Sequence, residues 1–403
     1  MRSYVTQYAN SSRNSRVRLP RPAVASLSAV AQIAPDRPVD PRFIRAAFVL
    51  TSPEGKHVVV NQADDRRLYD ASGKVTGVRA ARSDSNELLS THGVFAGAYQ
   101  FPWEMNANSD VIFVDGWRGA DSSRSYGIAD WAIWSDAGGL VIVWQRKQGG
   151  EVGPSEPAMI VTALQDRFDP QLGRKFVQIW EDLHLKGEGC GAIGPDGRAV
   201  VAMVDGRFVV YAAELSPRQQ PGGPIALETK IPYFAYDVSV IEPGYALLSS
   251  ARTEEILPSP HAREVRERLY RLRHARGSWP TRLHRHDAGG REVWSLDVSL
   301  SVRQPPIDGG GGRIYLAGGN GVIAIDDGKI AWQHLGSHLM MATAFEDGSL
   351  AVSNGPNLEI LGRDGQVVQS FATARKEPIT TPPAPASDGS IWLATAEALY
   401  VAR

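Results

Sequence analysis

Apolar and polar residues alternate over short stretches along most of the chain, and glycine-containing turns separate these stretches. The clearest example is the segment 312–334, GRIYLAGGNGVIAIDDGKIAWQH, in which three apolar runs are separated by turns and the last run ends at Trp332. Alternation with a period of two is typical of β-strands that bury one face. We therefore predict strands at 313–317, 321–325 and 328–332, as part of one four-stranded antiparallel unit.

The same rhythm begins near residue 43 and continues to the end of the chain. A first candidate unit has strands at 46–50, 56–60, 67–69 and 74–78. A hairpin is predicted within 194–215, because Gly206 can adopt the positive φ that a tight turn requires. Further runs with strand composition lie at 111–117, 129–134, 139–144, 158–164, 175–180 and 231–250.

Two interleaved series of glycines show that the rhythm is a repeat. Gly290, Gly328 and Gly365 precede apolar runs at spacings of 38 and 37 residues, and Gly312, Gly348 and Gly389 form the second series. A period of this length with four strands per unit indicates units arranged radially. We predict an all-β fold, a single β-propeller of four-stranded blades over residues 41–403. Seven blades are favoured, with eight as the alternative. The last strand, 399–402, should close the ring by pairing with a strand near 42–50.

Two segments break the rhythm. Residues 1–40 carry arginines in a background of Ser, Asn and Pro, which predicts a basic extended N-terminal arm that either wraps its own domain or docks on a partner. Apolar residues at helical spacing within 259–276 predict a helical insertion at about 257–280 with a basic exposed face, which either packs on the rim or docks on a partner. The candidate partner-binding residues are Arg13, Arg16, Arg18, Arg21, Arg266 and Arg273.

The overall charge is balanced, with 43 Lys and Arg against 44 Asp and Glu. Nucleic-acid binding is therefore an unfavoured reading that would depend on the basic arm. Cys190 is the only cysteine of the sequence, which excludes an intrachain disulfide and suits a reducing cytoplasm. The periplasm is the alternative location, since 22–34 imitates a weak signal peptide. No apolar run approaches the roughly 18 residues of a membrane span.

Candidate chemistry is sparse. His284 and His286 share one face of a predicted strand, and Asp287 follows them. Two histidines are too few for a metal site. The favoured interpretation is that their ring nitrogens are hydrogen-bonded within the protein or exposed to solvent. The pairs Asp64-Asp65 and Asp326-Asp327 lie in predicted turns, where Asp stabilises the backbone; calcium binding is the alternative. No G-x-S-x-G motif occurs in a strand-turn-helix setting. We therefore predict no catalytic residue, no metal site and no cofactor.

The segments AIDDGKIAW and HDAGGREVW resemble the PQQ-like repeat of quinoprotein-like propellers, roughly Ala-x-Asp-x-Gly-x-x-x-Trp. The matching positions are Ala324, Asp326, Gly328 and Trp332, with Asp287, Gly290 and Trp294 in the preceding unit. In that family the tryptophans lock neighbouring blades together. The resemblance therefore implies structural roles for Gly290, Trp294, Asp326, Gly328, Trp332 and Gly365. It does not imply bound pyrroloquinoline quinone, because the vicinal disulfide that accompanies the cofactor in many such enzymes needs two cysteines.

Propellers with such repeats and no cofactor ligands are similar to scaffold proteins, among them an outer-membrane assembly lipoprotein whose N-terminal lipid-anchored Cys this arm lacks. The expected function is a non-enzymatic interaction scaffold or adaptor subunit of a multiprotein bacterial assembly, with partners docking on the propeller loops and the basic arm. By analogy, the partners include ATPase or von Willebrand-type adaptor proteins. The alternative is a propeller enzyme, either a quinoprotein-like dehydrogenase or a calcium-dependent lactonase or hydrolase.

Overall fold

The structure is a computed structural model of the whole chain. It describes residues 15–33, 49–51, 57–61, 65–80, 87–90, 93–96, 103–106, 111–113, 126–135, 140–147, 158–169, 173–186, 189–194, 196–203, 206–213, 223–233, 235–250, 281–302 and 304–403. The regular secondary structure within these ranges is β, with no helix. The predicted helical insertion at 257–280 lies outside the described residues.

Five four-stranded sheets follow the order of the chain, so that each strand pairs antiparallel with the next. The predicted first unit is confirmed as the first of these sheets, and the hairpin predicted within 194–215 is confirmed as β15 and β16, with Gly206 at a φ of 84°. The sheets comprise β2 (Val49–Thr51), β3 (His57–Asn61), β4 (Asp65–Asp70) and β5 (Val75–Ala80); β6 (Glu87–Ser90), β7 (Gly93–Ala96), β8 (Trp103–Asn106) and β9 (Val111–Phe113); β10 (Tyr126–Ser135), β11 (Leu140–Lys147), β12 (Ala158–Asp169) and β13 (Gly173–Lys186); β14 (Gly189–Ile193), β15 (Ala199–Met203), β16 (Arg207–Tyr211) and β17 (Ile225–Lys230); β18 (Ala235–Ile241), β19 (Gly244–Ser250), β20 (Thr281–His286) and β21 (Glu292–Val298).

A sixth four-stranded sheet joins the two ends of the chain. Its order is β1 (Leu27–Gln32), β31 (Ala398–Ala402), β30 (Ile391–Ala394) and β29 (Ala384–Pro385). The last strand therefore pairs with an N-terminal strand, as predicted. The predicted partner near 42–50 is wrong, because β31 pairs with 27–32, within the segment expected to be an extended arm.

The seventh sheet is larger and contains the repeat from which the fold was predicted. Its strands are β22 (Ser301–Val302), β23 (Ile307–Gly310), β24 (Arg313–Asp326), β25 (Lys329–Ala344), β26 (Leu350–Asn354), β27 (Asn357–Leu361) and β28 (Val367–Ala372). β24 runs through the first two predicted strands, with Asn320 at a φ of 63° where a turn was expected. The first part of β25 pairs with β24 and its last five residues pair with β26. If this larger sheet is one blade, the propeller has seven blades, and if it is two blades, the propeller has eight. The blade count therefore stays a prediction.

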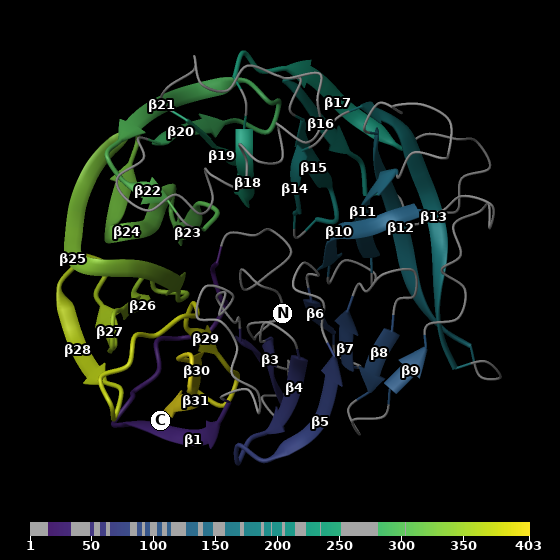
Figure 1. Cartoon of the computed structure of the whole chain (residues 1–403). Coiled ribbons are helices and arrows are strands. Elements are labelled where there is room, and N and C mark those ends of the chain that lie inside the picture. Colours follow the sequence, from purple (N-terminus) through teal and green to yellow (C-terminus); the bar gives the residue numbers. More distant parts are fainter. Residues whose placement is uncertain are drawn as a thin grey trace.

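The sheets stand around a ring, with β14, β18 and β29 near the middle and β1, β17, β21 and β28 at the rim (Figure 1). Burial follows this arrangement. Every residue of β15 and β18 is buried, whereas β17 and β28 alternate between exposed and half-buried positions near the rim. Apolar side chains from neighbouring sheets form the core, such as Tyr236 with Ile314 and Val238 with Phe208. This radial arrangement is that of a β-propeller.

A contact between a residue near the rim and a turn glycine recurs, three times between neighbouring sheets and once within the seventh sheet. Trp294 packs on Gly328, and Trp332 packs on Gly365 while its indole Nε1 donates a hydrogen bond to the Arg363 carbonyl oxygen (2.9 Å). Leu227 takes the tryptophan's place against Gly290, and the backbone carbonyl and Cβ of Val30 lie against Gly73. Each of these four glycines has a positive φ, which a residue with a Cβ adopts at a cost. These contacts support the structural roles predicted for Gly290, Trp294, Gly328, Trp332 and Gly365, which stay a prediction.

Two glycine substitutions separate the cost of this contact from the cost of the backbone conformation. Gly365 and Gly312 have nearly equal φ angles, 84° and 85°. A Cβ at Gly365 would lie 2.6 Å from Trp332, whereas a Cβ at Gly312 would meet nothing within 4 Å. Gly312→Ala should cost about 1 kcal/mol of unfolding free energy, and Gly365→Ala about 2–3 kcal/mol. Urea denaturation measures both, and equal losses would contradict the tryptophan contact.

Candidate functional site

Residues 15–19 lie along the edge of the last part of β25. Arg16 forms a parallel bridge with Ala344. The Val17 amide donates to the Ala344 carbonyl oxygen (2.8 Å), and the Ala344 amide donates to the Ser15 carbonyl oxygen (2.8 Å). Farther along, the Glu346 amide donates to the Leu19 carbonyl oxygen (3.0 Å). This part of the predicted arm is therefore bound to its own propeller.

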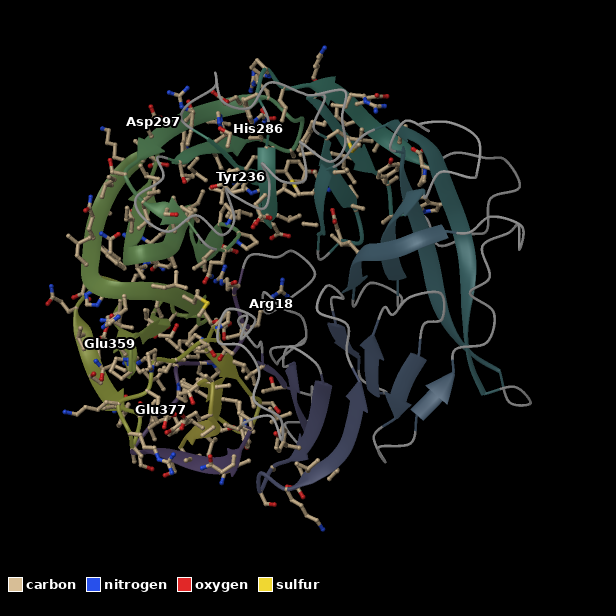
Figure 2. All side chains as sticks on the ribbon, viewed as in Figure 1. Arg18, Tyr236, His286, Asp297, Glu359 and Glu377 are labelled. Carbon is tan, nitrogen blue, oxygen red and sulfur yellow. The ribbon has the colours of Figure 1, made fainter. Side chains whose placement is uncertain are left out.

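Alternate side chains of this segment point to opposite environments. Val17 and Leu19 are buried in the core cluster that also contains the closing strand β31. Arg18 is exposed and lies near the middle of the disc (Figure 2), and Arg21 is also exposed. Arg18 therefore lies between two buried side chains and is itself in solvent. The fold thus presents two arginines from an anchored segment.

Arg16 is engaged within the chain. Its Nη1 lies 3.1 Å from Asp308 Oδ2, and its Nη2 donates to the Glu346 carbonyl oxygen (3.3 Å). A Cβ on Gly310 would lie 2.7 Å from the Arg16 guanidinium, so the absence of a side chain at Gly310 lets the two approach. Of the other candidate arginines, Arg13, Arg266 and Arg273 lie outside the described residues.

A buried polar cluster forms around the two histidines of β20. Hydrogen bonds join Ser249 Oγ to His284 Nε2 (2.8 Å) and His284 Nδ1 to Glu292 Oε2 (2.7 Å). His286 bonds through Nδ1 to the Gly290 carbonyl oxygen (2.8 Å) and through Nε2 to the Tyr233 hydroxyl. Both ring nitrogens of each histidine therefore have a hydrogen-bonding partner within the chain.

Stacking places this cluster at the junction of two sheets. The Tyr233 ring, which follows β17, stacks on His284 with ring centroids 3.6 Å apart, and Phe208 of β16 stacks on His286 at 5.8 Å. Burial lowers the pKa of His284 from 6.5 to about 4, against the opposing effect of the Glu292 carboxylate. Burial also raises the pKa of the Tyr233 hydroxyl well above its usual value. Both groups are therefore uncharged at neutral pH.

The chain of contacts from Ser249 through His284 to Glu292 has the connectivity of a serine hydrolase triad. Its environment differs from that of a catalytic site. Ser249 is 2% exposed, and the Tyr233 ring covers one face of His284. A histidine whose pKa is about 4 is also a poor base at neutral pH. These observations favour a structural network between two blades.

The acidic turn residues are used by the backbone and by arginines. Asp287 Oδ1 accepts hydrogen bonds from the amides of Gly289 (3.0 Å) and Arg291 (2.9 Å). Asp326 forms a two-pronged ion pair with Arg313, at 2.8 and 2.5 Å. No group of three or more His, Cys, Asp or Glu side chains in the described ranges could hold a metal ion. Within the same ranges, no helix has the length and apolarity needed to cross a membrane.

Comparison with known proteins identifies the fold. No protein-family model matches the sequence, and no curated protein sequence matches it. Among solved structures, Sqt1 of Saccharomyces cerevisiae has a TM-score of 0.55 at 8% identity, over 94% of this chain and 99% of that chain. BamB from Moraxella catarrhalis has a TM-score of 0.49 at 11% identity, over 93% and 99%. A chain of the Mitotic Checkpoint Complex has a TM-score of 0.45 at 12% identity, over 96% and 93%.

The likeness to Sqt1, together with the ring of sheets, shows that this chain is an all-β protein with the β-propeller fold. At 8% identity the likeness carries no statement about function. The resemblance to the PQQ-like repeat stays a prediction.

Proposed function

We propose that this protein is a non-enzymatic protein-interaction scaffold, an adaptor subunit that holds partner proteins within a multiprotein bacterial assembly in the cytoplasm. The observation that carries the proposal is the anchored N-terminal segment. It holds Arg18 and Arg21 in solvent between residues that are buried in the propeller core.

Anchoring makes these two arginines a favourable binding element. Val17 and Val24 are each only 3% exposed, so the backbone on both sides of the arginines is already ordered. A partner that binds here does not have to order the segment, and most of the usual entropy cost is avoided. Exposed guanidinium groups bind carboxylates in a two-pronged geometry. The expected partner surface is therefore acidic.

One observation favours the alternative, a propeller hydrolase, and that is the contact chain from Ser249 to Glu292. The buried Ser249 hydroxyl and the low pKa of His284 weigh against it. The two readings differ in what Ser249→Ala should do. An enzyme would lose its turnover, whereas a scaffold would keep its partners.

Charge reversal on the full-length protein tests the scaffold proposal. The Arg18→Glu/Arg21→Glu variant should recover its partners from cells at least about tenfold less well than the wild type, since two favourable contacts become repulsive. A matched variant, Lys230→Glu/Lys329→Glu, reverses two exposed charges on strands β17 and β25 and should recover them normally. Quantitative mass spectrometry of the purified complexes gives the comparison. Equal recovery by both variants would remove the arginines from the proposal.

A further inference from the structure

The edge of β25 that faces away from β26 is occupied by groups from elsewhere in the chain. The Gln304 side chain spans the main chain of Ala342, donating to its carbonyl oxygen (2.8 Å) and accepting from its amide (2.9 Å). Two residues farther on, Ala344 bonds to Ser15 and Val17, and the Glu346 amide then bonds to Leu19. Along this edge, the main chain of Ala342 is thus bonded by a side chain, and the main chains of Ala344 and Glu346 are bonded by the backbone of residues 15–19, which form one parallel bridge at Arg16. Backbone pairing of this kind resembles, over a short length, the addition of a peptide to an exposed sheet edge.

We call the site that holds this segment the seat, and it is defined by Ala344, Glu346, Asp308 and Gly310. The seat recognises the side chains of the bound segment as well as its backbone. Asp308 pairs with Arg16, while Gly310 leaves room for the guanidinium. The next inward positions, Val17 and Leu19, enter the apolar core. Arg18 is exposed. The seat therefore fits a segment with arginine, an apolar residue, any residue and a second apolar residue in that order.

We propose that this seat is a peptide-binding site for arginine-apolar-x-apolar segments of a partner protein, and that residues 15–19 occupy it as an internal competitor. This inference rests on the proposed scaffold function and names the chemistry of one partner and its control. A linked segment acts at an effective concentration on the order of 1 mM. At equal affinity, a free segment at micromolar concentration would fill roughly one seat in a thousand. Binding then requires that the internal segment be released or that the partner attach at a second point.

Direct peptide binding tests the seat. A variant that lacks residues 1–19 retains β1, and it should bind a fluorescein-labelled peptide of residues 15–21, SRVRLPR, while the full-length protein should not. Arg16→Glu in the peptide should weaken binding by about tenfold or more, because the peptide then meets Asp308 with a like charge. Arg18→Glu in the peptide should change binding by less than about threefold. Asp308→Lys in the protein should reverse the preference between the wild-type and Arg16→Glu peptides.

Two results overturn the inference: a folded truncated protein that binds no peptide at up to about 0.1 mM, or one that binds the wild-type and Arg16→Glu peptides equally. If the truncated protein does not fold, a full-length protein with a protease site inserted after Arg21 is cleaved after folding. The cleaved segment should be displaced by excess wild-type peptide and retained against the Arg16→Glu peptide. Equal displacement by both peptides overturns the inference.

The scaffold proposal and the seat fail separately. Reversal of Arg18 and Arg21 in the full-length protein measures the exposed arginines, whereas Arg16→Glu in the peptide measures the seat. If the Arg18→Glu/Arg21→Glu variant loses its partners and the truncated protein binds no peptide, only the proposed peptide-binding seat is overturned. Peptide binding by the truncated protein, with equal partner recovery by both full-length charge-reversal variants, supports the seat and removes the exposed arginines.

Discussion

Leu399→Asp should prevent the protein from folding stably. Leu399 is fully buried in β31, which pairs with β1 on one side and β30 on the other. A carboxylate placed there has no charged partner within its strand. It would have to be buried in its charged form or become protonated, and either costs several kcal/mol of unfolding free energy. Because domains of this kind are stable by only about 5–15 kcal/mol, we expect loss of the cooperative urea transition or a large fall in its midpoint. Circular dichroism in urea measures this.

The control replaces an exposed apolar residue by the same charged one. Val368 of β28 is 52% exposed, so Val368→Asp should change the unfolding free energy by less than about 1 kcal/mol. Deleting residues 396–403 removes β31 and leaves β1 without its partner strand. The deleted chain should be at least as unstable as Leu399→Asp. Unchanged melting of the deleted chain would contradict closure of the ring by β31.

The strands were predictable because their burial is regular. The repeat around Gly328 and Trp332 gives clear alternation, and the strands of the first unit were placed within a few residues. The closing strand β1 was missed for a physical reason. Its burial does not alternate, and its register with β31 shifts between Ala29 and Ala31, so a period of two is absent from LSAVAQ. A bulge therefore hid the strand within a segment that resembles an arm.

The candidate sites show where sequence reasoning stops. The arginines of the N-terminal segment stood out by composition, but the separation of Arg16 from Arg18 depends on Asp308, 292 residues away along the chain from Arg16. The pair His284 and His286 was visible on one strand. Ser249 comes from the neighbouring strand β19 and Tyr233 from the connection between β17 and β18, and only the fold brings them to the histidines. Contacts of this range leave no local pattern to read.

Acidification should weaken the protein through His284. In the unfolded chain this histidine has a pKa near 6.5, and in the folded protein burial lowers the pKa to about 4. Between these two pH values the unfolded chain binds a proton that the folded protein does not bind, so stability falls as the pH falls. The loss begins below pH 6.5 and is complete near pH 4. A difference of this size corresponds to about 3 kcal/mol of unfolding free energy.

The expected loss requires that the protonated ring find no better partner in the cluster. The groups that face His284 are Ser249, Tyr233, Glu292, His286 and Arg282. Glu292 opposes the shift, while His286 and Arg282 add to it. Several aspartates also have lowered pKa values, among them Asp297 and Asp326, because arginines hold their charged forms. These carboxylates lose their contribution at lower pH, below their ordinary pKa of 3.8, so among the described groups with shifted pKa values the window from pH 6.5 to about 4.5 reports mainly on His284.

A pair of glutamine variants isolates the effect. His284→Gln removes the titrating ring and should flatten the dependence of unfolding free energy on pH between 6.5 and 4.5, although it lowers stability at pH 7 by breaking the contacts with Ser249 and Glu292. His338 is exposed, so His338→Gln should leave the slope of the wild type intact. Urea titrations at pH 7, 6, 5 and 4.5 measure all three proteins. Equal slopes for the wild type and His284→Gln would mean that the buried cluster accepts a proton without cost, and the junction between the two sheets would then not sense pH.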